Sequence, residues 1–287
     1  MPYVETNDID TYYERHGNGQ PIVFVHGLTM DRRTWAPQVD ALAGDYEVIT
    51  YDYRGHGETE AGDPSEYSIQ SLADDLRALI ERLEIDTPVL CGHSYGGLIV
   101  AEYAVQYPDD VVGLVFADAR TDIGERAWER AFFRLKPAVD ELKDIIGKER
   151  VERAQSAVTK RLADAERELN PEVDAIGLTV NEYEDDASEQ VARDVEYAHY
   201  RAGLDYIGTT PTAFDVPVLY VYGENGANLI RGKAERLRRA PTDVRVAEIE
   251  VADHWVSLQR PELFNGVVED FLADVYESAP AGAETAA

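Results

Sequence analysis

The chain has 287 residues, of which 44% are hydrophobic, so it can bury a large core in one domain with an insertion or in two small domains. Its formal net charge is −29, and only five of its 27 basic residues are lysine. Such an acidic surface is a poor partner for nucleic acid. The single cysteine, Cys91, excludes an internal disulfide and is expected to be a small buried side chain.

An excess of acid with little lysine is typical of halophilic proteins, whose carboxylates stay hydrated and whose repulsion is screened in multimolar salt. An ordinary acidic soluble protein is the alternative. The first residues, MPYVETNDID, show no signal peptide, and no apolar run approaches the length of a membrane span. We expect a cytoplasmic protein with no membrane partner, and the sequence leaves the oligomeric state open.

Strand and helix patterns alternate over most of the chain. A polar–aromatic alternation over 8–17 ends at the turn Gly17-Asn18-Gly19. Further on we predict a helix over 68–85, capped by Ser68 or Ser71. The remaining predicted elements are strands at 21–27, 46–52, 87–91, 111–118, 216–223 and 244–251, and helices near 32–44, 95–107, 228–240 and 261–276. Continuous apolar strands alternating with helices predict an α/β fold with a mostly parallel central sheet flanked by helices.

Residues 119–210 break this alternation, because they are highly charged, helical in pattern and without strand runs. The segment is too long for a loop, so we predict a helical lid inserted between two strands. The core would then comprise residues 1–118 and 211–276. The last residues, 277–287, are small and polar and are expected to form a flexible tail.

The sequence Gly92-His93-Ser94-Tyr95-Gly96 follows an apolar strand and precedes an amphipathic helix. Glycines two residues on either side of a serine allow a strand-to-helix turn too sharp for larger side chains. Such a turn exposes the serine oxygen above the N-terminus of the next helix. The pattern therefore predicts a nucleophilic serine, with an ordinary strand–turn–helix connection as the alternative.

Four segments together resemble landmarks of the α/β-hydrolase fold family, in the family's order and at its spacing. They are FVHGLTMDRRTW, YDYRGHGET, GHSYGG and VADHWVSLQRPELF. The resemblance covers the predicted core, and the lid is unmatched.

This resemblance implies roles for individual residues. Ser94 would be the nucleophile, and His254, after the last strand, would be the base that a weakly nucleophilic hydroxyl requires. The backbone N–H groups of Leu28 and Tyr95 would form the oxyanion hole. Trp35 would line the substrate pocket, or it would pack in the core beside its own helix.

The acid of the triad is where the sequence departs from the family. Gly226 stands at the position where most relatives carry an aspartate. We favour Asp118, at the end of the preceding strand, because some family members place their acid there. Glu224 is the alternative, and Asp253, or no acid at all, remains open.

The other histidines carry no expected catalytic role. His26 and His93 flank the oxyanion and nucleophile turns, where packing and turn hydrogen bonds explain them. His56 lies in the RGHG turn and is expected to be structural, while His16 and His199 belong to no motif.

The resemblance implies hydrolysis of a small carboxylic ester or lactone through an acyl-serine intermediate. No His/Cys/Asp cluster has ligand spacing and no glycine loop suits a phosphate, so we expect a small-molecule substrate and no metal or cofactor. Cleavage of carbon–carbon bonds and perhydrolysis use the same triad elsewhere in the family. The missing aspartate also leaves open a ligand-binding protein of the same fold with little turnover.

Overall fold

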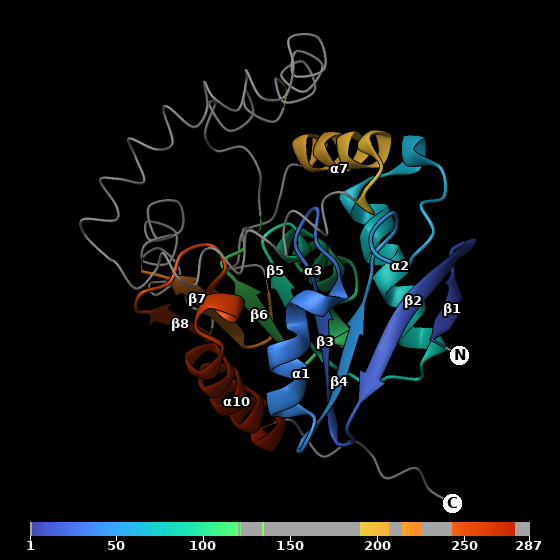
Figure 1. Cartoon of the computed structure of the whole chain (residues 1–287). Coiled ribbons are helices and arrows are strands. Elements are labelled where there is room, and N and C mark those ends of the chain that lie inside the picture. The colour runs from blue at the N-terminus through green and yellow to red at the C-terminus, as the bar shows by residue number, and fades with distance from the viewer. Residues whose placement is uncertain are drawn as a thin grey trace, which may run out of the picture.

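The structure is a computed structural model that describes residues 2–119, 121, 134, 190–206, 214–224 and 243–278. In this part of the chain, eight strands form one sheet in the order β1-β2-β4-β3-β5-β6-β7-β8 (Figure 1). The pairs β1–β2 and β2–β4 are antiparallel, and every other pair is parallel. The strands are β1 Tyr3–Thr6, β2 Ile9–His16, β3 Gln20–Val25, β4 Tyr46–Tyr51, β5 Val89–His93, β6 Gly113–Ala117, β7 Val218–Gly223 and β8 Val244–Ile249.

Helices cover both faces of this sheet (Figure 1). They are α1 Ala36–Leu42, α2 Ile69–Arg82, α3 Gly96–Gln106, α7 Arg193–Asp205, α9 Val256–Gln259 and α10 Pro261–Ser278, with 3₁₀ turns at Arg32–Trp35, Pro64–Glu66 and Pro108–Asp110. The predicted α/β fold with a mostly parallel, helix-flanked sheet is therefore confirmed.

The alternation of side chains along the strands divides the core into two layers. In β3, Val23 and Val25 pack in the layer shared with α2 and α3. Their neighbours Ile22 and Phe24 pack in the opposite layer with α1 and α10. Successive strand residues point to opposite faces, so a strand covered on both sides must be apolar throughout. Five of the six residues of β3 are buried accordingly.

The start of α2 shows how local sequence fixes an element. The hydroxyl of Ser68 accepts a hydrogen bond from the Ser71 N–H at 2.9 Å, and the Ser71 hydroxyl accepts one from the Ser68 N–H at 2.9 Å. This reciprocal capping satisfies two N–H groups that the helix itself leaves unpaired. Leu72, Leu76 and Leu79 then bury one face of the helix against the sheet.

The strand order places the ends that carry the site residues side by side. After β3 the chain moves outward to β4, and then returns to the other side of β3 to form β5. Ligands of open α/β sheets bind beyond the carboxyl ends of the strands at such a reversal. The turns after β3, β5, β6 and β8 all begin at this edge, which is where the predicted site residues lie.

The division into a core of residues 1–118 and 211–276 and a lid of residues 119–210 stays a prediction. The described part of the predicted lid contains α7, which lies above α2 and beside the turn at 64–66 (Figure 1). Within residues 119–210 the structure describes 119, 121, 134 and 190–206, and the other residues of the predicted lid lie outside the described part of the chain. The predicted helix near 228–240 and residues 279–287 of the predicted tail lie outside it too, while 277 and 278 belong to α10.

Candidate active site

Ser94 lies in a sharp turn between β5 and α3. Its φ is +50°, in the left-handed region that non-glycine residues seldom adopt. The flanking glycines make the turn possible: a Cβ on Gly92 would lie 2.6 Å from the Gly96 carbonyl oxygen, and one on Gly96 would lie 2.4 Å from the Val25 carbonyl oxygen. Such approaches are far inside van der Waals contact. Residues 92 and 96 must therefore be glycine, because the strand and helix backbones approach too closely here for a Cβ atom.

A chain of hydrogen bonds joins Ser94, His254 and Asp118. The Nε2 atom of His254 lies 2.9 Å from the Ser94 Oγ, and its Nδ1 lies 2.6 Å from Oδ2 of Asp118. These residues are far apart in the sequence and follow β5, β8 and β6. The predicted nucleophile, base and favoured acid thus lie within hydrogen-bond distance of one another, in the order that a serine–histidine–acid triad requires.

Gly223 lets the segment before His254 approach the sheet. A Cβ on Gly223 would lie 2.4 Å from the carbonyl oxygens of both Ala252 and Asp253. The turn carrying His254 therefore rests on the bare backbone at the end of β7. The His254 side chain remains 45% exposed, so its ring is accessible from outside the sheet edge.

Asp118 is a buried carboxylate with a strained backbone. Its φ is +41° and only 4% of its side chain is exposed. Burial raises the pKa of the Asp118 carboxyl above its usual range, the hydrogen bond from His254 opposes the rise, and the charge of Asp253 adds to it. Within the described part of the chain its second oxygen, Oδ1, has no hydrogen-bond partner. The His254 ring is therefore the contact that compensates this buried charge.

The alternative acids point to other groups. Oε2 of Glu224 accepts a hydrogen bond from the Val251 N–H at 3.3 Å. Oδ1 of Asp253 accepts one from the Trp255 N–H at 3.1 Å, within the turn that precedes α9. Gly226, the position where most relatives carry the acid, lies outside the described residues.

The two predicted oxyanion donors lie after the carboxyl ends of two neighbouring strands, β3 and β5. Leu28 follows the turn after β3, and Tyr95 directly follows Ser94 at the start of α3. In the part of the chain that the structure describes, neither backbone N–H donates a hydrogen bond to another group. Both therefore remain available to a ligand oxygen.

Trp35 packs in the core of the described structure. Its side chain is fully buried, with its ring centroid 4.7 Å from that of Phe24 and 6.3 Å from that of Phe264. The aromatic surface of Trp35 thus fills the layer between β3 and α10. These contacts are those of the core-packing alternative, and a substrate contact of Trp35 stays a prediction.

His93 supports the base in a way that the sequence did not reveal. Its Nε2 lies 2.9 Å from the carbonyl oxygen of His254, and a carbonyl accepts only, so this nitrogen carries the proton. Burial lowers the pKa of His93 to about 3, which keeps the ring neutral. Gly27 leaves room for the ring, because a Cβ there would lie 2.8 Å from His93 Nδ1. The residue before the nucleophile thus fixes the backbone of the base.

Neither a metal cluster nor a membrane helix was found in the described regions. No three His, Cys, Asp or Glu side chains gather there in a way that could hold a metal ion. None of the helices described combines the length and the low charge that crossing a bilayer requires.

Comparison with known proteins identifies the family to which this chain belongs. Residues 20–261 match the model of the alpha/beta hydrolase fold family. The chain therefore belongs to this family and is an alpha/beta hydrolase.

Relatives of full length carry several hydrolase names. A putative carbamate hydrolase RutD of Azorhizobium caulinodans is 27% identical over 96% of this chain and 99% of its own. A 2-(acetamidomethylene)succinate hydrolase of Mesorhizobium japonicum is 27% identical over 94% of each chain. Among solved structures, the enol-lactonase from Burkholderia xenovorans LB400 has a TM-score of 0.72 and 27% identity, covering 95% of this chain and all of that one.

Proposed function

We propose that the protein is a serine hydrolase that cleaves a small carboxylic ester or lactone through an acyl-serine intermediate. The observation that carries this proposal is the hydrogen-bonded series Ser94–His254–Asp118, with distances of 2.9 and 2.6 Å. The enol-lactonase relative supports a lactone or ester in particular. We further propose that Asp118, and neither Glu224 nor Asp253, is the acid.

The mechanism follows from what each group can donate or accept. His254 Nε2 removes the Ser94 proton as Oγ attacks the substrate carbonyl, and the negative charge moves to the carbonyl oxygen. The Leu28 and Tyr95 N–H groups then stabilise this oxyanion. Asp118 holds the His254 ring in one tautomer and stabilises its charged form.

The remaining steps release both products. The protonated His254 gives its proton to the leaving alkoxide, which departs and leaves Ser94 acylated. A water molecule then loses a proton to His254 and attacks the acyl carbon, and Ser94 recovers its proton as the acid product leaves. In a lactone the leaving alkoxide and the acid are ends of one molecule, so the ring opens.

The first prediction tests the nucleophile. Ser94→Ala should lower kcat by about a million-fold, because loss of a triad nucleophile has that effect in serine hydrolases. The assay is hydrolysis of a panel of p-nitrophenyl esters and lactones, with Ser65→Ala, which changes a serine in the turn at 64–66, as the matched control. An alanine variant that keeps a tenth of the wild-type rate would overturn the mechanism.

A labelling experiment separates this enzyme from a binding protein with the same fold. A fluorophosphonate should attach to one residue per chain, and mass spectrometry should place it on Ser94. A protein that stays unlabelled yet binds an ester or lactone, as measured by calorimetry, would support the binding protein instead.

A further inference from the structure

The turn that presents the Leu28 N–H is held from both sides by side chains outside the proposed triad. We infer that Tyr53 and His56 are positioning residues for the oxyanion hole, which they keep aimed at the bound carbonyl. The inference rests on the proposed function, because it concerns the same oxyanion. Neither residue was singled out for this role by the sequence.

The first argument concerns a single peptide plane. The Leu28 N–H and the Gly27 carbonyl belong to one planar peptide unit and point in opposite directions. A group that fixes the Gly27 oxygen therefore fixes the direction of the Leu28 N–H. A donor of this kind works only when it is aimed at the position that the oxyanion will occupy.

Two side chains anchor that oxygen. The Tyr53 hydroxyl donates to the Gly27 carbonyl at 3.1 Å, and His26 Nδ1 donates to it at 2.8 Å. The Tyr53 and His26 rings are stacked, with centroids 4.1 Å apart and planes inclined by 12°. All of these groups are buried, so water does not compete for the carbonyl. The Met30 N–H adds a weaker contact at 3.3 Å.

The other side of the turn is held at Thr29. Its φ is +61°, a left-handed conformation that costs free energy in a β-branched residue. The Thr29 N–H donates to Nε2 of His56 at 3.2 Å, and its hydroxyl donates to the Leu28 carbonyl at 2.7 Å. His56 thus stabilises the unfavourable conformation that sends the turn past Leu28.

His56 can accept this bond in one protonation state. Its Nδ1 lies 3.3 Å from the Arg54 carbonyl and must carry the proton, which leaves Nε2 as the acceptor for Thr29. A charged ring would place a second N–H against the Thr29 N–H. Burial, together with the neighbouring His199 and His26, lowers the pKa of His56 well below its usual range, so the ring stays neutral.

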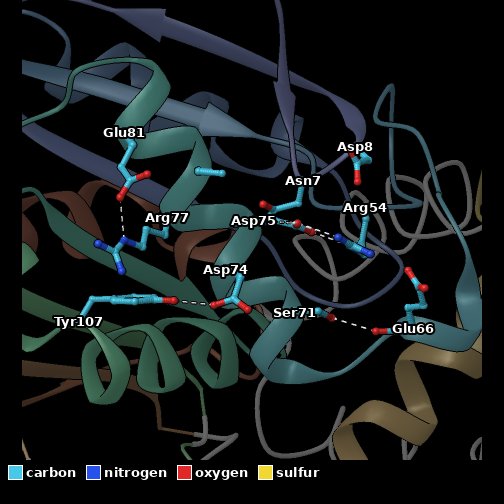
Figure 2. A pocket seen from close by; sticks show the side chains of 11 residues that line it. Asn7, Asp8, Arg54, Glu66, Ser71, Asp74, Asp75, Arg77, Glu81 and Tyr107 are labelled. Carbon is cyan, nitrogen blue, oxygen red and sulfur yellow. Dashed lines mark hydrogen bonds and ion pairs between the residues drawn. The ribbon is translucent and has the colours of Figure 1, made fainter.

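Helix α2 keeps the His56 partner in place. The Arg54 guanidinium is paired with Asp75 of α2, with Nη2 donating to Oδ1 at 2.6 Å. Figure 2 shows this pair facing each other in a polar cavity of about 610 Å³ along α2. Nδ2 of Asn7 donates to the same carboxylate at 3.0 Å. Because the side chain of Arg54 is held in this way, its carbonyl is a fixed acceptor.

The same carbonyl also links the second oxyanion donor. Nε2 of His199, on α7, donates to the Arg54 carbonyl at 3.1 Å. The Tyr95 hydroxyl donates to the His199 carbonyl at 2.9 Å, and Tyr95 carries the second N–H of the oxyanion hole. Both donor residues are therefore tied to the backbone at Arg54, one through His56 and one through α7.

The test compares two tyrosines close together in the chain. Tyr53→Phe removes the hydroxyl that anchors Gly27, whereas Tyr51→Phe removes a buried hydroxyl that has no partner among the described residues. Outright removal of an oxyanion donor lowers kcat by about 100- to 1,000-fold, so a misaimed donor in Tyr53→Phe should cost about ten-fold in kcat with KM unchanged. Tyr51→Phe should retain the wild-type kcat.

A second pair tests His56. The amide oxygen of glutamine reaches the position of Nε2, whereas asparagine reaches only that of Nδ1. His56→Gln should therefore keep most of the kcat, and His56→Asn should lose it to the same extent as Tyr53→Phe. Equal kcat values for the glutamine and asparagine variants would count against the inference.

A third measurement responds to oxyanion binding alone. A trifluoromethyl ketone forms an anionic adduct with a serine nucleophile, and its affinity for Tyr53→Phe should fall by the same factor as kcat. If the wild type is labelled at Ser94 and turns over, but Tyr53→Phe and Tyr51→Phe match in kcat and inhibitor affinity, this inference alone is overturned. If the wild type shows no turnover that depends on Ser94, the proposed function fails and the inference fails with it.

Discussion

Asp118 is the member of the proposed triad for which the sequence offers an alternative residue. In Asp118→Asn the amide would keep the shape of the side chain but favour the wrong tautomer of His254, and a comparable change in a serine protease lowers kcat about ten-thousand-fold. We expect a loss of this size in ester hydrolysis. Glu224→Gln is the control, because Glu224 contacts the Val251 N–H, and it should change kcat little. The reverse pattern would transfer the role of the acid to Glu224.

The same substitution should have the opposite effect on stability. Because burial raises the Asp118 pKa in the folded state, the native carboxylate binds its proton more tightly than the unfolded one does. The free energy of unfolding therefore falls as pH rises from the unfolded pKa of about 3.9 through the raised folded value, and stays lower above it. The amide introduced by Asp118→Asn cannot ionise, so the variant avoids this loss.

Asp118→Asn should thus have a higher Tm than the wild type at pH 7, with the difference shrinking as the pH falls through the Asp118 pKa. Thermal melts followed by circular dichroism between pH 3 and 8 would measure it. A variant that is less stable at pH 7 would show that the His254 contact outweighs the cost of burial.

At the scale of elements, α3 lies close to the strands at Gly96. A glycine-to-alanine change in a helix usually stabilises the fold, and here we expect it to destabilise the fold. Gly96→Ala places a Cβ 2.4 Å from the Val25 carbonyl oxygen and 2.6 Å from that of His26, so α3 must move away from β3. Gly266→Ala, in α10, meets nothing within 4 Å. Alanine in an open helix position stabilises by about 0.5–1 kcal/mol, so Gly266→Ala should raise the free energy of unfolding.

Gly96→Ala should lower that free energy by about 1–3 kcal/mol, as overpacking does. Urea melts of the two variants provide the comparison. Equal and positive shifts for both would mean that the turn around Ser94 is looser than its contacts indicate.

The sequence predicts the elements of the core because their signals are local. Apolar runs mark β3, β4, β5 and β7, and Ser68 with Ser71 marks the start of α2. The edge strand β1 was not predicted, since Tyr3–Thr6 has four residues, of which one is buried. The antiparallel pairing of β1 with β2 is a contact between two segments, and the sequence pattern of Tyr3–Thr6 alone does not predict it.

The candidate site is predictable to the extent that motifs mark it. Sequence motifs predict the turn around Ser94 and the position of His254. The acid is not, because Asp118 and Glu224 follow adjacent strands, and only the folded geometry shows which carboxylate reaches the ring. The supporting contacts of Tyr53, His93 and His199 are pairings across long sequence separations, which a single sequence does not encode in any spacing.

At the scale of the whole molecule, we expect the net charge of −29 to determine how stability depends on salt. Repulsion among carboxylates should destabilise the fold in dilute buffer, and salt should relieve it as the screening length falls from about 10 Å at 0.1 M to about 3 Å at 1 M. We therefore expect Tm to rise steeply up to molar KCl. Chloride is the salt of choice, because sulfate also strengthens apolar burial and would confuse the two effects. An unchanged Tm between about 0.1 and 3 M would contradict adaptation to high salt.

The left-handed backbone at Ser94 and Asp118 has a consequence for laboratory evolution. At both positions glycine, or asparagine at the second, would relieve the strain, so a population selected for thermal stability alone should discard these two side chains early. Selection for turnover would hold them in place. One library can be selected in parallel for thermal stability and for turnover. Positions that differ between the two selections are those where a side chain lowers stability and is needed for catalysis.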